Sequence, residues 1–250
     1  MAKQGRLTLK NVGYSMPADA PAYQSPPFYY RGSRVISVAF ETEAEGAMDA
    51  IPALLSIREP ATAALSFLQY NWTTFGPYDE AVLSLMVEHR GRPMAYVLQI
   101  AVTSEPPMLG GREIWGFPKK LARPKITHEG DVVVCTLHYG SVLCVCATMG
   151  FKHREIDKAP LLKALARPNF MIKIIPDVDC TPRICELVRY YMEDVTLKGA
   201  WAGPAAIQLF EHALCDVARL PVREVVSAVH YVTDLTLGLG EIVFDYLKDA

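Results

Sequence analysis

The sequence predicts an α+β fold that is mainly antiparallel β-sheet, with a few helices at its margins. Three observations predict this class: most apolar segments have the length of strands, short Gly-containing turns join several of them, and only three stretches have helical spacing. Because so few helices are available to cover an open sheet, we expect the sheet to close into a barrel or to stack as a sandwich. The chain of 250 residues is at the upper end for one domain, and we predict a single domain over residues 1–250.

The first third of the chain predicts an extended arm, two strands and an interrupted helix. The first 30 residues are rich in Pro, Ala and Tyr, and we expect residues 1–30 to wrap the body as an arm. Residues 35–43 alternate in polarity and residues 61–72 are apolar, so both predict strands. Residues 45–55 have helical spacing, although Pro52 interrupts it.

Two hairpins are predicted in the middle of the chain. Residues 81–89 and 94–103 form one, and residues 131–139 and 142–149 form the other, which turns at Gly140. The first strand of the second hairpin carries apolar side chains on both faces. This pattern is typical of a central strand that is covered on both sides.

The last third of the chain predicts further strands and two helices. Residues 157–166 predict a short helix that ends before Pro168, and residues 205–218 predict a second helix with one apolar side. Further strands are predicted at residues 170–175, 184–196 and 222–234.

Composition excludes several functional classes. A net charge of −2 and a pI of about 6.3 provide no electrostatic attraction to nucleic acid or to an anionic membrane. No window approaches the ~18 apolar residues of a membrane span, and no apolar stretch of a secretory signal follows the basic N-terminus. The six cysteines form no CxxC pair and have no accompanying His cluster, so they predict reduced core thiols rather than a metal site. We therefore expect a cytoplasmic protein with neither a nucleic-acid nor a membrane partner.

The segment at residues 111–120, GREIWGFPKK, has the composition of an amine-catalyst site. Amine catalysis needs an uncharged lysine, whereas a free lysine, with a pKa near ~10.4, is almost fully charged at pH 7. Apolar burial and a neighbouring cation both favour the uncharged form. Around Lys119, the aromatic residues Trp115 and Phe117 can supply the apolar burial, and Lys120 can supply the neighbouring cation. On spacing alone, a solvated surface pair is the commoner explanation of two adjacent lysines, so both interpretations stay open.

The residues GRE (111–113) and FPKKL (117–121) closely resemble the active-site segment of the acetoacetate decarboxylase family. The resemblance extends over roughly residues 26–248 and includes ATMGFKH (147–153), RPNFMIKIIP (167–176), PRICEL (182–187) and the run at 200–222. It implies a curved, barrel-like antiparallel sheet with the site in its interior, and assembly into homo-oligomers. It also implies a carboxy-lyase that converts a small keto acid, acetoacetate, to acetone and carbon dioxide through a lysine Schiff base, without a cofactor or a metal.

The resemblance also implies roles for individual residues. Lys119 matches the Schiff-base lysine, and acetoacetate decarboxylase is the established precedent for a lysine activated by desolvation or by a second cation. Lys120 matches the neighbouring lysine, whose charge or packing keeps Lys119 neutral; if Lys120 points away, desolvation remains as the main cause. Glu80 aligns with a family glutamate near the reacting groups, where it can move protons or balance an arginine. From the sequence alone, a plain loop carboxylate is the simpler interpretation of Glu80.

Arg34 aligns with an arginine of the family's site, and a guanidinium is suited to orienting a substrate carboxylate. The neighbouring Arg31 is the alternative, and a surface arginine is the simplest interpretation of either. Four aromatic residues are expected to line the pocket or to belong to the core: Phe28, Tyr29, Tyr30 and Phe117.

One position departs from the family pattern. Leu65 stands where the resemblance predicts a second glutamate, so Lys120 can lack its usual partner. The departure can also mark a relative that uses the lysine for aldol-type condensation, retro-aldol cleavage or dehydration of other keto acids. A non-catalytic barrel that binds small carbonyl or apolar ligands is a third hypothesis, against which the intact set of Lys119, Lys120, Arg34 and Glu80 argues.

Overall fold

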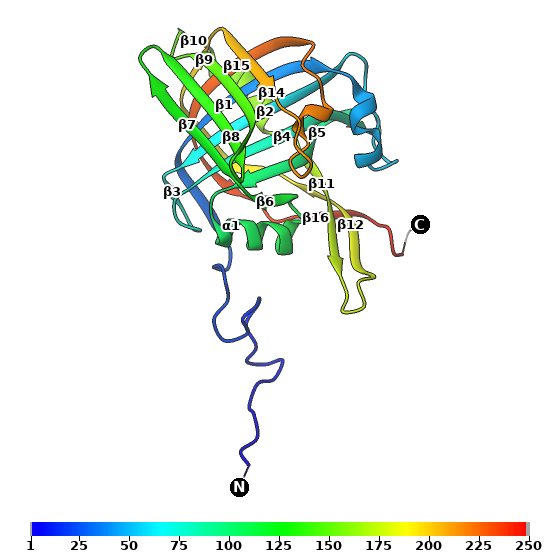
Figure 1. The fold of residues 1–250 in the computed structure, drawn as a ribbon. Helices are drawn as coiled ribbons and strands as arrows, with labels where there is room; N and C mark the ends of the chain where they lie inside the picture. The colour runs from blue at the N-terminus through cyan, green and yellow to red at the C-terminus, as the bar shows by residue number, and fades with distance from the viewer. Residues whose placement is uncertain (1, 249–250) are drawn as a thin grey trace.

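The computed structural model describes residues 2–248, which form two β-sheets with short helices around them (Figure 1). The larger sheet has twelve strands: β1 (Phe28–Thr42), β2 (Ala61–Tyr70), β3 (Trp72–Thr73), β4 (Tyr78–His89), β5 (Arg92–Val102), β6 (Lys119–Leu121), β10 (Arg154–Glu155), β11 (Asn169–Pro176), β12 (Pro182–Tyr190), β13 (Met192–Ala202), β15 (Glu224–Leu237) and β16 (Glu241–Asp245). The smaller sheet has four: β7 (Arg123–Glu129), β8 (Val132–Tyr139), β9 (Val142–Gly150) and β14 (Ala205–Leu209). The helical elements are α1 (Glu105–Gly110), α2 (Lys158–Leu165), the 3₁₀ turns η1 (Ala44–Ala50) and η3 (Val217–Arg219), and the π-helical turn η2 (Gly111–Trp115).

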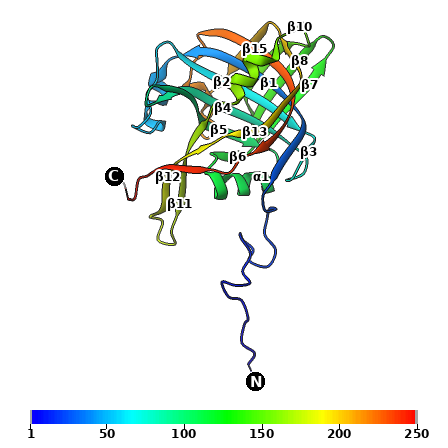
Figure 2. The same ribbon diagram turned by 180° about the vertical axis from the view of Figure 1, so that it is seen from behind.

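The large sheet is curved and mainly antiparallel, as predicted. Its strands follow the order β10-β13-β15-β1-β2-β4-β5-β11-β12-β16, while β3 pairs with β1 and β6 pairs with β5. Only the pairings of β5 with β11 and with β6 are parallel. The two strands at the ends of the path, β10 and β16, do not pair with each other within residues 2–248, so the sheet curls without closing (Figure 2).

Strand alternation gives the large sheet two faces with different surroundings. On its outer face, Leu65 and Leu83 pack against Val133 and Leu137 of the small sheet in the main apolar core. On its inner face, alternate residues of the same strands line a cavity. The small sheet therefore supports the large one from outside and leaves the inner face free to form a site.

The predicted hairpins and the helix at 157–166 are confirmed. Strands β4 and β5 join through Arg90 and Gly91, both with positive φ (51° and 75°), which suits the twist of a two-residue hairpin turn. Strands β8 and β9 turn at Gly140, whose φ is 61°. The α2 helix is capped by Asp157, whose side chain accepts a hydrogen bond of 3.1 Å from the Ala159 N–H.

The helix predicted at residues 205–218 is wrong. Residues Ala205–Leu209 form β14, which pairs antiparallel with β9, and only Val217–Arg219 form a helical turn. The backbone N–H and C=O groups of an amphipathic segment can form hydrogen bonds either within a helix or with a free strand edge. Here the exposed edge of β9 decides the outcome.

Three further predictions need adjustment. The strand predicted at 184–196 is two strands, β12 and β13, because the two halves pair with different partners, β11 and β15. The helical spacing at 45–55 yields only the 3₁₀ turn η1, which ends before Pro52. The strand β8 lies inside its sheet, yet Val134 and Thr136 on its outer face are only half-buried, so that face is not covered as predicted.

The N-terminal segment leaves the body of the molecule. Residues 2–27 contain no helix or strand, and Figure 1 shows their first part running away from the sheets rather than wrapping them. Tyr23 anchors the later part of the segment: it is buried, and its hydroxyl donates a 2.6 Å hydrogen bond to Glu113.

Two further predictions from the sequence concern the cysteines and membrane-spanning segments. All six cysteines are free of disulfides, but Cys180 is exposed in the turn between β11 and β12 and is not the core thiol expected. Among residues 2–248, no helix is both long enough and apolar enough to cross a membrane.

Candidate active site

The inner face of the large sheet encloses a cavity of about 310 Å³, within the size range of small-molecule sites. Most of its lining is apolar or aromatic. Two of its lining side chains, the amine Lys119 and the carboxylic acid Glu80, are almost completely buried. This pair is the candidate catalytic centre, because buried ionisable groups in a cavity rarely serve packing alone.

Strand β6 positions Lys119. Lys119 is in parallel register with Ile100 of β5, which directs its side chain to the inner face. Its amine donates a 2.9 Å hydrogen bond to Oε2 of Glu80, and the two side chains are 6% and 8% exposed. The rings of Phe117 and Tyr78 lie 5.2 and 5.7 Å from the same nitrogen. Since water is largely excluded, the pair can exchange one proton at close range without a change in its total charge.

Strand β4 supplies Glu80 and one of the tyrosines near it. Tyr78 and Glu80 are two residues apart and therefore share the inner face of the strand. The hydroxyls of Tyr30 and Tyr78 lie 3.2 Å apart, and Tyr70 and Tyr190 line the same end of the cavity. Burial raises the pKa of Tyr30, Tyr78, Tyr70 and Tyr190, so these phenols stay neutral hydrogen-bond donors over the working pH range.

The sequence motif did not identify most of these tyrosines. Tyr30 was expected at the pocket or in the core, and it lines the cavity, but Tyr70, Tyr78 and Tyr190 carry no motif of their own. The signal that could have found Tyr78 is its position two residues before Glu80 on an alternating strand.

Gly111 is required for the packing of the lysine stem. A Cβ at Gly111 would lie 2.8 Å from Cδ and 3.0 Å from Cε of Lys119. The carbonyl of Gly111 also accepts hydrogen bonds from the N–H groups of Gly116 and Phe117, at 3.1 and 3.0 Å, which holds the FPKK turn against η2. The glycine of the motif thus allows its own loop to fold back over the Lys119 side chain.

Substituting Gly111→Ala is therefore expected to lower activity more than stability. The added methyl group must displace the Lys119 stem, and misplacement of a reacting group by about 1 Å can cost ~10²-fold in rate. Steady-state kinetics should show a lower kcat, and borohydride trapping of Lys119 should slow in parallel, while thermal melting moves little. An unchanged kcat would mean that the stem tolerates the methyl group.

Lys120 lies outside the cavity. Because consecutive residues of a strand point to opposite faces, Lys120 faces the small sheet, and its amine donates a 2.8 Å hydrogen bond to the carbonyl of Leu214. It lines a separate cavity of about 200 Å³ between the two sheets, and Leu65 lines the same cavity. The position at which the resemblance predicts a glutamate is therefore on the Lys120 side, and its replacement leaves the surroundings of Lys119 intact.

Arg34 is not brought to the candidate centre either. A bulge after Tyr30 shifts the register of β1, and Arg34 then shares the outer face with Ile36, where its guanidinium contacts His128 of β7. The alternative, Arg31, donates at 2.8 Å to the carbonyls of Tyr30 and Leu235. The arginine that does line the cavity is Arg167, beside α2.

The surroundings of Arg34 contain an unusual histidine. His230 is 2% exposed, and neither of its ring nitrogens has a hydrogen-bond partner among residues 2–248. Burial lowers the pKa of His230 to about 4, and the nearby cations Arg34, Lys152 and His128 act in the same direction. The imidazole is therefore neutral in the folded protein at pH values where an unfolded histidine is already charged.

This difference predicts an acid-sensitive stability. The folded-state pKa of His230 lies below the unfolded value of ~6.5, so the protein loses stability as pH falls from 6.5 toward 4. Between pH 7 and 4.5 the loss from this one group is about 2.5 kcal/mol. Urea unfolding should show that His230→Phe loses that much less stability over this range than the wild type. A His153→Phe control, on an exposed residue, should retain the wild-type slope; equal slopes for all three proteins would contradict the assignment.

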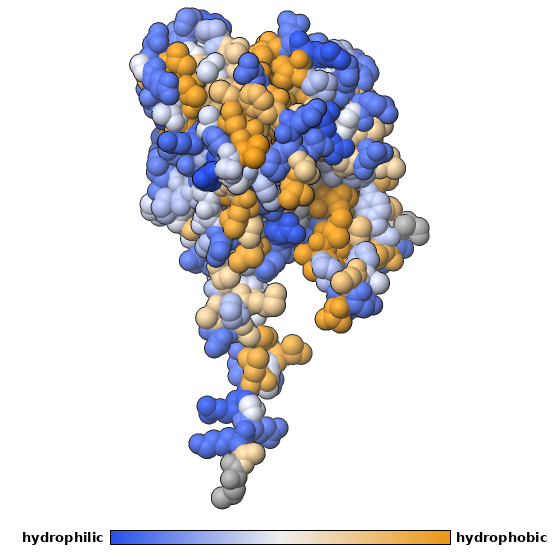
Figure 3. All heavy atoms as spheres, in the orientation of Figure 1, coloured by the Kyte–Doolittle hydropathy of each residue, from blue (hydrophilic) through white to orange (hydrophobic). Residues whose placement is uncertain are grey.

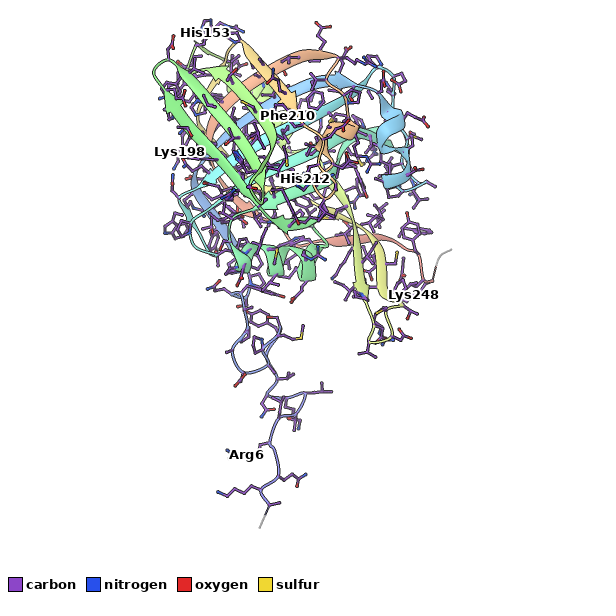
Figure 4. All side chains as sticks on the ribbon, viewed as in Figure 1. Arg6, His153, Lys198, Phe210, His212 and Lys248 are labelled. Atoms are coloured by element: carbon purple, nitrogen blue, oxygen red, sulfur yellow. The ribbon has the colours of Figure 1, made fainter. Side chains whose placement is uncertain are left out.

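The remaining histidines do not form a common site. His153 and His212 lie well apart, and no group of three or more His, Cys, Asp or Glu side chains within residues 2–248 is arranged to hold a metal ion (Figure 4). The arrangement that the structure does assemble is an amine and a carboxylate in a largely apolar cavity. Such an arrangement can form a Schiff base with a ketone and move protons at the reacting atoms.

Comparison with known proteins places this site in a family. The family model for acetoacetate decarboxylase (ADC) matches residues 15–247. The chain is 49% identical over 239 residues to acetoacetate decarboxylase 1 of Bradyrhizobium diazoefficiens, covering 96% of each protein. It is 50% identical over 236 residues to acetoacetate decarboxylase 3 of Mesorhizobium japonicum, covering 94% of this chain and 92% of that protein.

Solved structures agree with this result. The crystal structure of acetoacetate decarboxylase from Legionella pneumophila is 34% identical and superposes with a TM-score of 0.90 over 99% of this chain and 100% of the other. The enduracididine biosynthesis enzyme MppR complexed with pyruvate superposes with a TM-score of 0.77 over 94% of this chain and 99% of the other; at 22% identity it shows a shared fold alone. By the family model and by the identities over nearly its whole length, the chain belongs to the acetoacetate decarboxylase family.

Proposed function

We propose that this protein is a carboxy-lyase that converts acetoacetate to acetone and carbon dioxide, with Lys119 as a covalent catalyst and without a cofactor. The observation that carries the proposal is the buried amine of Lys119, 2.9 Å from the Glu80 carboxylate in a mainly apolar cavity. The relatives named acetoacetate decarboxylase, at 44–50% identity, support the choice of reaction.

The reaction begins at the ketone carbon. Glu80 takes a proton from Lys119, and the freed lone pair attacks the carbonyl to give a carbinolamine. Glu80 returns that proton to the departing hydroxyl, which leaves as water, and an iminium remains. The iminium is a far better electron sink than the ketone, which is why an amine accelerates decarboxylation.

The carbon–carbon bond to the carboxylate then breaks. Its electron pair moves into the iminium to form an enamine, and carbon dioxide leaves. A proton supplied by solvent adds to the enamine carbon in place of the lost carbon dioxide, and one water molecule hydrolyses the resulting iminium to acetone and the free Lys119 amine. The apolar lining supports the central step, because the negative charge of the carboxylate is spread and then lost as the bond breaks, and a poorly solvating cavity favours that loss.

The tyrosine end of the cavity is the proposed site of the substrate carboxylate. The neutral hydroxyls of Tyr30 and Tyr78 lie 3.2 Å apart in the lining of the cavity that contains Glu80, and they can donate hydrogen bonds to an anion. This assignment replaces the role that the resemblance implied for Arg34, whose side chain is on the outer face. The Lys120 amine likewise contacts Leu214 on the other face of β6, so the proposal gives Lys120 no part in the proton transfer between Lys119 and Glu80.

The alternative aldolase or dehydratase activity rested on Leu65. Because Leu65 lines the cavity between the sheets with Lys120, its identity does not distinguish the chemistry at Lys119. The relatives named acetoacetate decarboxylase, at 44–50% identity, therefore favour decarboxylation over the alternative.

The test is proton NMR of acetoacetate incubated with the purified protein, with the Lys119→Gln protein as the control for spontaneous decay. Acetone should form faster with the wild type, and borohydride added during turnover should attach the substrate carbon skeleton to Lys119. Turnover without an adduct on any lysine would rule out the Schiff base. No turnover of acetoacetate would instead redirect the search to condensation of pyruvate with aldehydes.

We also propose that the protein is cytoplasmic and assembles into a homo-oligomer. Two projecting segments carry exposed apolar side chains: Leu9 in the N-terminal segment is 95% exposed, and Val178 at the tip of the β11–β12 hairpin is 100% exposed (Figure 3). Apolar side chains on projecting segments are typical of contacts between subunits. Sedimentation of the purified protein measures the subunit number directly.

A further inference from the structure

The cavity extends well beyond the lysine. Strand β4 lines it with Glu80, Val82, Ser84 and Met86, all on the inner face. Six residues of antiparallel strand separate Glu80 from Met86, which corresponds to about 20 Å. Acetoacetate, a four-carbon acid held at Lys119, occupies only the end of this space.

The two ends of the cavity differ in chemistry. Around Lys119 and Glu80 the lining contains the tyrosine hydroxyls described above. Farther along, the strand register brings Ala64 opposite Ser84 and Ala95 opposite Met86, and Leu161 and Leu165 of α2 border the same region. The far part is lined by these apolar side chains together with the polar Ser84, Arg167 and Asn169, and the two alanines keep it open where larger residues would fill it.

A cavity with a reactive polar end and a long apolar extension fits a substrate with the same polarity. We propose that this protein also decarboxylates 3-oxo acids with a linear alkyl chain, releasing the corresponding methyl ketone and carbon dioxide. The ketone carbon lies at Lys119, the carboxylate at the tyrosine end, and the alkyl chain along β4 toward α2. The inference rests on the proposed function, because it uses the same Schiff base and changes only the group on the far side of the ketone.

Burial of the alkyl chain sets the expected size of the effect. Each buried methylene contributes ~0.8 kcal/mol, or about fourfold, if the contact is made in the transition state. Two methylenes separate acetoacetate from 3-oxohexanoate, so we expect kcat/KM to rise by about 16-fold between them.

The experiment measures kcat/KM for acetoacetate, 3-oxohexanoate and 3-oxooctanoate by carbon dioxide release, with Lys119→Gln as the control for spontaneous decay. An increase from acetoacetate to the longer acids supports the inference. A steady decrease with chain length, with acetoacetate turned over normally, overturns the inference and leaves the proposed function in place. Absence of Lys119-dependent turnover for all three acids would instead reject the proposed function, and the inference with it.

Variants of the far lining locate the alkyl chain. Ala64→Phe should lower the ratio of kcat/KM for 3-oxooctanoate to that for acetoacetate by ~10-fold or more, because the ring fills the space of several methylenes. Ala95→Phe should act in the same way from the opposite strand, which keeps the test valid if one variant fails to fold. The control is Thr62→Phe, on the same face of β2 but beyond the residues that line the cavity, and it should leave the ratio unchanged. An unchanged ratio in both alanine variants would overturn the placement of the chain.

Discussion

Replacing Lys119 with glutamine is expected to lower kcat for acetoacetate by roughly 10⁴-fold or more, to near the rate of spontaneous decay. Glutamine keeps much of the side chain's length and can still hydrogen-bond Glu80, but its amide nitrogen is not a nucleophile and cannot form an iminium. Acetone formation followed by proton NMR measures the loss, and mass spectrometry after borohydride treatment should find no adduct on the variant.

The adjacent lysine provides a matched control. Lys120→Gln makes the same chemical change one residue away, on the opposite face of β6, where the amine contacts Leu214. We expect its kcat to stay within about threefold of wild type, because a solvent-screened charge on the far side of the sheet affects Lys119 weakly. A large loss of kcat in Lys120→Gln, with the adduct on Lys119 retained, would mean that the positive charge of Lys120 influences Lys119 across the sheet.

Replacing Glu80 with glutamine is expected to lower kcat by ~10²- to 10⁴-fold, the usual range for a general acid–base. The amide is nearly isosteric and keeps the 2.9 Å contact with Lys119, but it cannot accept the proton that the amine must lose. Because binding of the keto acid is retained, KM should change much less than kcat. Steady-state kinetics with acetoacetate separates the two parameters.

Asp79→Asn is the control for the Glu80 substitution. Asp79 precedes Glu80 on β4 and points to the other face of the sheet. Asp79→Asn therefore also replaces a carboxylic acid by an amide, but it does not alter the lining of the cavity. A similar loss of kcat in both variants would mean that the effect comes from disturbing β4 and not from the loss of a proton acceptor. A full kcat in Glu80→Gln would assign the proton transfers to another group.

The hairpins were predictable from sequence because their determinants are local. Alternating polarity and a Gly-containing turn suffice to pair β4 with β5 and β8 with β9 without reference to any distant residue. The segment at 205–218 was not predictable in the same way. Its apolar spacing suited a helix, and only the free edge of β9, more than fifty residues earlier in the chain, converts Ala205–Leu209 into a strand.

The candidate site likewise has features that follow from local sequence and features that depend on pairing between distant strands. The motif FPKKL and the resemblance around it point to residues 117–121 as the segment of the Schiff-base lysine and to Glu80 as a carboxylate near the reacting groups, and the tertiary structure brings the Lys119 amine to 2.9 Å from Glu80. Alternation along a strand also implies that Lys119 and Lys120 face opposite ways, but it does not say which of them faces inward. The pairing of β6 with β5 decides that point, and the bulge after Tyr30 decides the outward direction of Arg34.

The sequence by itself determined the mainly antiparallel fold and the family, because these depend on local patterns and on motif residues that are contiguous in the chain. Only the tertiary structure decided that Arg34 and Lys120 lie outside the cavity, that Leu65 accompanies Lys120, and that the apolar space continues along β4 toward α2. These features depend on strand register and sheet curvature. Both arise from pairings between residues far apart in sequence, where a shift of one residue reverses the face of every side chain.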